Sequence, residues 1–174
     1  YSRAINLGAE KANNPLLLFL NNDMEIQDAH WLEEMSQWTL IPEIGVVGAK
    51  LIRENHSIQH AGIVIGLQDL VGHLYLNAPE DYFGLLGSAN WYRNLGAVTG
   101  ACQMMRREVF EEMGGYDETY QLVFSVIEFC LRLVKNGYRI MVTPNASIKH
   151  LEGKSRGYKT PRGDLLRGFE AMRE

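Results

Sequence analysis

Residues 16–26 read LLLFLNNDMEI, in which five apolar residues are followed directly by Asn21, Asn22 and Asp23. An apolar run of this length predicts a short strand that is covered on both faces of a sheet. The polar residues after it predict that the strand ends there. Because ligands gather at the carboxyl ends of strands in open α/β sheets, we expect Asp23 to face a cleft.

The segments around this strand alternate between helical and extended patterns. Helical spacing of apolar residues predicts helices over 2–12, 31–38, 107–113 and from Ser125 to just before Gly137. Extended patterns predict strands at 44–52, 58–67, 96–105, 138–143 and 146–151. Residues 68–95 have no clean period and predict an irregular excursion. This alternation favours an α/β open sheet flanked by helices.

Composition places the chain among ordinary globular domains. Of 174 residues, 46% are hydrophobic and 22% are charged, and the net charge of −4 argues against a nucleic-acid-binding stripe. No apolar run is long enough to span a bilayer. Cys102 and Cys130 lack metal-ligand spacing and are expected to be buried, reduced thiols, as in a cytoplasmic protein.

One domain accounts for the whole length, 1–174. Residues 1–152 are expected to form its sheet and helices. The basic stretch that begins with GKSRGYKTPRGD predicts a mobile loop over 153–174 with a short terminal helix.

The carboxylate of Asp23 has two interpretations. Next to two amides, it suits a hard divalent cation such as Mg²⁺ or Mn²⁺, which prefers oxygen ligands. Alternatively, the NND tripeptide makes an Asx turn that caps the following helix. The tripeptide alone leaves both open.

Four segments, taken in order, resemble the family 2 glycosyltransferases of GT-A fold, in particular their rhamnosyltransferase-like branch. The segments are LLLFLNNDMEI, GAKLIRENHSIQHAGIVIG, AVTGACQMMRREVFEEMGGYDE and IEFCLRLVKNGYRIMVTPNASIKHLEGKSRG. The resemblance covers residues 1 to about 157. It implies metal-dependent transfer of a sugar from a nucleotide-diphosphate donor to a hydroxyl acceptor, usually with inversion, in surface polysaccharide or cell-wall glycan synthesis.

The resemblance also implies partners, a cofactor and a location. The donor is a nucleotide-diphospho-sugar, the acceptor is a saccharide or a lipid-linked glycan, and the cofactor is Mn²⁺ or Mg²⁺. Neither nucleic acid nor a transmembrane segment is implied. A bacterial-type cytoplasmic enzyme is expected, peripheral at the inner face of the membrane in the full-length protein.

Particular side chains take roles by the same resemblance. The implied metal ligands are Asp23 and His150. The implied donor contacts are Asn6, Asn21, Asn22 and Arg156. The implied acceptor contacts are Thr99, Gly100, Ala101 and Trp91. Each also has a plainer interpretation as a capping, packing or solvated residue. His60 and His73 are expected to be packed or surface histidines rather than metal ligands.

Two departures from the family pattern matter. The chain begins after the family's first strand and helix, which leaves an exposed sheet edge and favours a homodimer. In addition, the family's acidic motif near the last helix reads Ser125-Val126-Ile127-Glu128 here. Val126 cannot accept a proton. Glu128 matches the last acid of the motif, where it could orient an acceptor or substitute as the base. The alternative for Glu128 is an ion pair with Arg132 one helical turn later.

Three functions therefore stay open. The first is a glycosyltransferase with Glu128 as its catalytic base. The second is a degenerate domain that binds a nucleotide sugar or a glycan without turnover. The third is a nucleotidyltransferase, which would normally need an early Gly-rich phosphate loop with a basic residue, in a part of the domain that this sequence is expected to lack.

Overall fold

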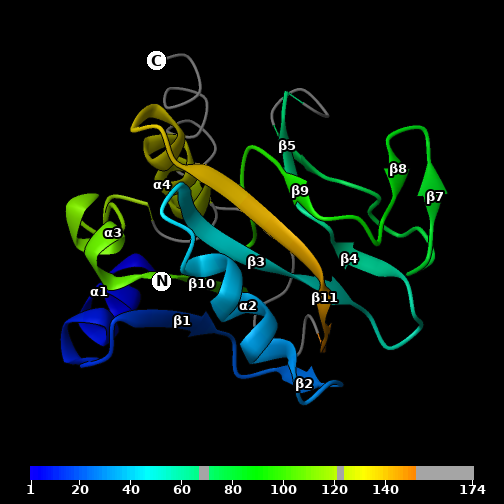
Figure 1. Cartoon of the computed structure of the whole chain (residues 1–174), viewed down its shortest axis with the longest axis horizontal. Coiled ribbons are helices and arrows are strands. Elements are labelled where there is room, and N and C mark those ends of the chain that lie inside the picture. Colours follow the sequence, from blue (N-terminus) through cyan, green and yellow to red (C-terminus); the bar gives the residue numbers. More distant parts are fainter. Residues whose placement is uncertain (67–70, 121–123, 152–174) are drawn as a thin grey trace.

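The structure is a computed structural model that describes residues 1–66, 71–120 and 124–151 (Figure 1). Within these residues a seven-stranded sheet has the order β1-β10-β3-β11-β2, with β4 paired to β3 and β9 paired to β11. The bounds are β1 (Leu16–Leu20), β2 (Met24–Ile26), β3 (Ile44–Ile52), β4 (Ile58–His60), β9 (Arg93–Asn94), β10 (Cys102–Arg106) and β11 (Arg139–His150). β3 and β11 run parallel, whereas β1–β10, β10–β3 and β11–β2 are antiparallel. The expected open mixed sheet is confirmed.

Helices cover both faces of this sheet. α2 (Trp31–Thr39) packs on one face, and α1 (Ser2–Lys11), α3 (Arg107–Glu112) and α4 (Phe124–Lys135) pack on the other. The central strand β3 serves both layers, because side chains alternate across a strand. Val46 is buried in the core beneath α4, and its neighbour Val47 is buried in the core beneath α2. No helix in the described ranges combines the length and apolarity needed to cross a bilayer.

The excursion after β4 folds into short antiparallel pairs. β5 (Ile63–Ile65) pairs with β6 (Val71–His73), and β7 (Phe83–Gly84) pairs with β8 (Gly87–Ser88). Lys50 of β3 anchors the excursion, since its Nζ donates to the Glu80 carbonyl at 2.5 Å and to Asn90 Oδ1 at 2.6 Å. The irregular stretch is thereby fixed to the sheet.

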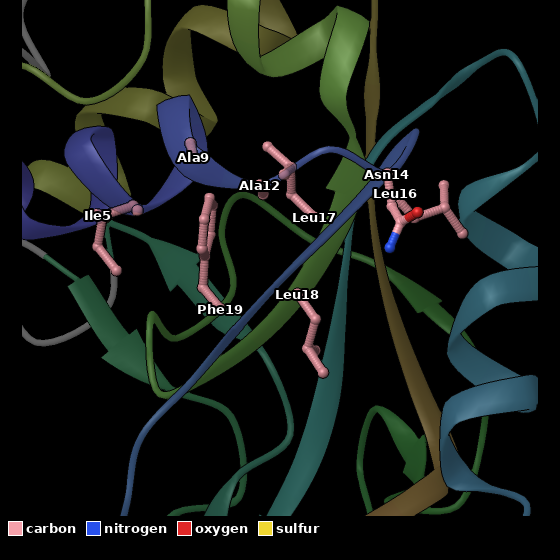
Figure 2. Close-up of a pocket in the computed structure, with 9 residues that line it drawn as sticks. Ile5, Ala9, Ala12, Asn14, Leu16, Leu17, Leu18 and Phe19 are labelled. Atoms are coloured by element: carbon pink, nitrogen blue, oxygen red, sulfur yellow. The ribbon is translucent and has the colours of Figure 1, made fainter.

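The first strand is covered on both faces, as expected, but unequally. Leu17 and Phe19 are buried in the core beneath α4, and Leu16 and Leu18 are partly buried against the core beneath α2. Only Leu20, at the end of the strand, is exposed, at 42%. An apolar hollow of about 250 Å³ lies between this strand and α1. Figure 2 shows residues that line it, such as Ile5, Ala9 and Phe19. None of the predicted site residues lines it.

Three other strand boundaries differ from the sequence-based expectation. The predicted strand 58–67 is broken at Gly62, whose φ of +102° only glycine adopts readily. The strand predicted from residue 96 begins at Cys102, because the backbone before it bonds outside the main sheet: Ala97 exchanges two backbone hydrogen bonds with Ile63, and the Thr99 N–H donates to His60 Nε2. Finally, the two strands predicted at 138–151 form one strand, β11, with a register shift between Thr143 and Ser147.

Candidate active site

The side chains of Asp23 and His150 are in contact although the two residues are 127 positions apart in the sequence. Asp23 directly precedes β2, and His150 is the last residue of β11. The two strands pair antiparallel with Met24 opposite His150, and the Leu151 N–H donates to the Asp23 carbonyl at 2.9 Å. The sheet therefore holds both backbones at the same end of the same ladder.

The two side chains also face one another. Nε2 of His150 lies 3.0 Å from Oδ1 of Asp23. The side chain of His150 is 9% exposed and that of Asp23 is 23% exposed, so the pair is partly buried but reaches solvent through the carboxylate. An Asp23 carboxylate sealed inside the core and far from His150 would have excluded a shared ligand, and the structure shows the opposite arrangement.

The other ring nitrogen of His150 contacts Gln59 of β4. Nδ1 lies 2.7 Å from Oε1 of Gln59, which is 7% exposed. With the amide oxygen as acceptor, Nδ1 carries a proton, and Nε2 is the ring nitrogen that faces Asp23. The sequence analysis did not identify Gln59. Its only signal is a polar residue between apolar neighbours in a predicted strand.

This donor set fits a divalent cation. A proton on Nε2 makes this contact an ordinary hydrogen bond to Oδ1, and a cation could take the place of that proton. Neighbouring ligands of an octahedral Mg²⁺, each about 2.1 Å from the ion, are about 3.0 Å apart, and Nε2 and Oδ1 have this separation. Within 1–66, 71–120 and 124–151, no group of three or more His, Cys, Asp or Glu residues is arranged to hold a metal. Asp23 and His150 would therefore supply two ligands.

The segment predicted to contact the acceptor lies beside the NND motif. The Asn21 N–H donates to the Ala101 carbonyl at 2.9 Å, which joins the end of β1 to the start of β10. The Tyr1 hydroxyl donates to the Gly100 carbonyl at 3.0 Å. A Cβ on Gly100 would lie 2.4 Å from the Tyr1 hydroxyl oxygen, so a side chain there would displace the tyrosine. Asn22 is exposed.

Val126 lies against this same segment. Its Cγ2 would be 2.7 Å from a Cβ on Gly100, and the residue is 6% exposed. Glu128 instead forms a bidentate pair with Arg132, with Oε1 2.5 Å from Nε and Oε2 2.8 Å from Nη2. This is the ion pair that helical spacing offered as the alternative to a base. Action as a base would require Glu128 to leave Arg132.

The remaining predicted residues are placed as follows. Asn6 holds the turn after α3, since its amide donates to the Tyr116 carbonyl and accepts from the Tyr116 N–H, both at 2.9 Å. A donor contact by Asn6 would have to compete with these bonds. Trp91 is 53% exposed and packs edge-on against Phe83. Arg156 lies outside the described residues.

His60 and His73 contact each other, which their spacing in the sequence does not reveal. Their Nδ1 atoms are 3.1 Å apart, and Nε2 of His60 accepts from the Thr99 N–H at 3.2 Å. Burial, reinforced by His73, holds the pKa of His60 well below its usual value. A buried neutral His60 therefore supports the backbone at Thr99, in agreement with the expectation of a packed histidine.

Comparison with known sequences agrees with the family resemblance found in the sequence. The family model described as glycosyl transferase family 2 matches residues 1–114. The O-antigen biosynthesis protein RfbC of Myxococcus xanthus is 40% identical over 175 residues, which cover 99% of this chain and 14% of that protein. An N-acetylglucosaminyl-diphospho-decaprenol L-rhamnosyltransferase of Mycobacterium tuberculosis is 32% identical over 65 residues, or 37% of this chain and 21% of that enzyme. The chain thus spans a small part of the length of these relatives.

Comparison with solved structures identifies a similar fold. A crystal structure of GalNAc-T7 with UDP, GalNAc and Mn²⁺ superimposes with a TM-score of 0.71 at 16% identity. The match covers 98% of this chain and 34% of that one.

Proposed function

Since the chain belongs to glycosyl transferase family 2 and has the GT-A fold, we propose that it acts in sugar transfer from a nucleotide-diphosphate donor to a hydroxyl acceptor. We assign the transfer to surface polysaccharide or cell-wall glycan synthesis. The names of RfbC and of the mycobacterial rhamnosyltransferase support this assignment. The lipid-linked substrate in the second name makes a saccharide on a lipid carrier the favoured acceptor.

The observation that carries the proposal is the Asp23–His150 pair. Asp23 offers a carboxylate oxygen and His150 offers Nε2 to a Mn²⁺ or Mg²⁺ ion, with the two atoms 3.0 Å apart. When bound, such an ion neutralises the charge that builds on the departing diphosphate. With two ligands from the described residues, other coordination positions stay open for phosphate oxygens and water. Ion and nucleotide should therefore strengthen each other's binding, and by the same factor.

The acceptor side is built from backbone. Thr99, Gly100 and Ala101 form a segment without bulky side chains, fixed by bonds to His60, Tyr1 and Asn21. In our proposal the acceptor hydroxyl lies over this segment, with Trp91 as an exposed aromatic surface on which a sugar can stack. Asn21 and Asn22, next to the metal-binding aspartate, contact the donor. Inversion is proposed from the family resemblance.

A second function is favoured by one observation. At the position where the family has its base, Val126 places methyl groups against Gly100, and the nearby Glu128 is engaged with Arg132. A domain built in this way would bind nucleotide sugar without transferring it. Turnover of a donor by the full-length protein, with loss of turnover in Glu128→Gln, would favour the enzyme. Binding without turnover across a donor panel would favour the binding domain.

Calorimetric titration of Mn²⁺ tests the metal site, with UDP or dTDP present and absent. We expect Mn²⁺ to bind more tightly with the nucleotide and Asp23→Ala to weaken this binding at least about tenfold. Glu25→Ala is the matched control: it removes a carboxylate two residues away that pairs with Lys149 at 3.7 Å. Glu25→Ala should bind as the wild type does. Equal heats for the wild type and Asp23→Ala would exclude the proposed site.

A further inference from the structure

Thr99 and Gly100 are the part of the proposed acceptor segment that solvent reaches. Both are half-buried, whereas Val98 before them and Ala101 after them are buried. The Thr99 N–H donates to Nε2 of His60 at 3.2 Å. His60 is fully buried and is the last residue of β4. A core side chain therefore holds the peptide over which the acceptor hydroxyl is proposed to lie.

The donor in this contact determines where the proton of the His60 ring lies. A backbone N–H can only donate, so Nε2 accepts, and a neutral ring carries its proton on Nδ1. Nδ1 of His60 lies 3.1 Å from Nδ1 of His73 in β6, and the two rings meet edge to face. The Nδ1–H of His60 therefore donates to His73. Two hydrogen bonds in series connect Thr99, His60 and His73.

The bond to His60 lies midway between two backbone attachments of the segment. At one end Ala97 exchanges two hydrogen bonds with Ile63 of β5. At the other end the Ala101 carbonyl accepts from the N–H of the residue after β1. Removing the bond at Thr99 should therefore loosen the middle of the segment while both ends stay in place.

We propose that His60 is a positioning residue for the acceptor segment and that His73 orients its ring. Hydrogen bonds at both nitrogens fix the plane of an imidazole, and the fixed ring then fixes the Thr99 peptide. A misplacement of about 1 Å lowers an enzymatic rate about 100-fold, so an acceptor surface made of backbone depends on such support. This inference rests on the proposed function, because it concerns the same acceptor segment.

Two substitutions of His60 separate its two contacts. In His60→Gln the amide oxygen can take the place of Nε2 and accept from Thr99. In His60→Asn the shorter side chain still reaches His73 but no longer reaches Thr99. Hydrogen–deuterium exchange of the full-length protein, read at single residues by mass spectrometry, measures the Thr99 amide. We expect it to exchange at least about fivefold faster in His60→Asn, to keep most of its protection in His60→Gln, and the Ala97 amide to be unaffected in both.

Transfer kinetics separate a positioning role from a packing role. The full-length protein is assayed with a panel of nucleotide sugars and an N-acetylglucosaminyl-diphospho-lipid, the acceptor in the name of the mycobacterial relative. His60→Asn should lower kcat/KM for the acceptor about 10- to 100-fold with little change in the donor KM, and His60→Gln should recover most of the loss. The matched control is His56→Asn at an exposed position, which should behave as the wild type does.

A second variant serves if His60→Asn does not fold. His73→Leu, at a half-buried position, removes the atom that accepts from the His60 ring and should change Thr99 exchange and acceptor kcat/KM in the same direction. Thr99 exchange or acceptor kcat/KM that does not respond to loss of these contacts overturns this inference, while transfer by the wild type upholds the proposed function. A wild-type protein that transfers from no donor overturns the proposed function instead, so the two failures are distinguishable.

Discussion

Replacing Glu128, which pairs with Arg132, tests whether Glu128 has a structural role, a catalytic role or both. Arg132 donates to both oxygens of Glu128 and also to the carbonyls of Met113 and Gly115, and its guanidinium lies 5.2 Å from the centre of the Phe129 ring. The pair thereby fastens α4 to the turn that follows α3. We predict that Glu128→Gln destabilises the fold measurably, because the amide cannot balance the charge of Arg132.

The magnitude follows from exposure and geometry. The side chains of Arg132 and Glu128 are 29% and 16% exposed, so the pair lies between a surface ion pair and a buried one. Surface pairs contribute about 0.2–1 kcal/mol, and hydrogen bonds to charged groups contribute about 1.5–3 kcal/mol. For this bidentate pair we expect a coupling free energy of about 1.5–2 kcal/mol.

A double-mutant cycle measures that coupling. Urea unfolding at 25 °C is compared for the wild type, Glu128→Gln, Arg132→Met and the double variant. A coupling below about 0.3 kcal/mol would refute the structural role. Turnover measured on the same variants tests the catalytic role. A general base contributes about 10²–10⁴-fold to the rate, so a folded Glu128→Gln variant with wild-type turnover would show that Glu128 is not the base.

Three further predictions concern the core. Because burial holds the pKa of His60 well below its usual value, the folded state stays neutral where the unfolded state binds a proton. The unfolding free energy should therefore fall as pH drops below about 6.5, by up to about 1.4 kcal/mol per pH unit, and His60→Gln should reduce this slope in urea titrations. Burial raises the pKa of Cys102 and Cys130 to about 12; Ellman's reagent should modify neither in the native state and both in urea, and rapid native modification of either would contradict the packing. Gly48→Ala should cost about 1–3 kcal/mol in thermal or urea unfolding, because its Cβ would lie 2.5 Å from Val98; an unchanged stability would refute that contact.

Local patterns predicted the parts of the fold that local physics determines. The helix that begins at Ser2, the left-handed glycines after α3 and the β3 strand all follow from spacing and turn chemistry. The ion pair at Glu128 was foreseen as an alternative for the same reason, since i and i+4 are neighbours on any helix. The predicted break at Pro144 was wrong, because the sequence did not show that one strand, β11, continues through this residue.

The site could be predicted only through the family resemblance. The likeness singled out Asp23 and His150 together, and no local pattern connects residues so far apart. Gln59 was missed because a single glutamine in a strand carries no signature of what it faces. The contact between His60 and His73 was missed because it depends on the path of β4 through β6, which periodicity does not give.

The register shift in β11 has a consequence for the evolution of chain length. Between Thr143 and Ser147 this strand advances four residues while β3 advances one. Beyond the shift, Ile148 and His150 are buried, and the intervening Lys149 is less so. If the strand beyond the shift moved by one place, deleting one residue from the shift would bring His150 to the place of Lys149 and Leu151 to the place of His150, so that the imidazole would leave Asp23. Related chains that keep the Asp23–His150 contact should therefore change in length here only where the irregular part of β11 absorbs the change and His150 stays opposite Met24.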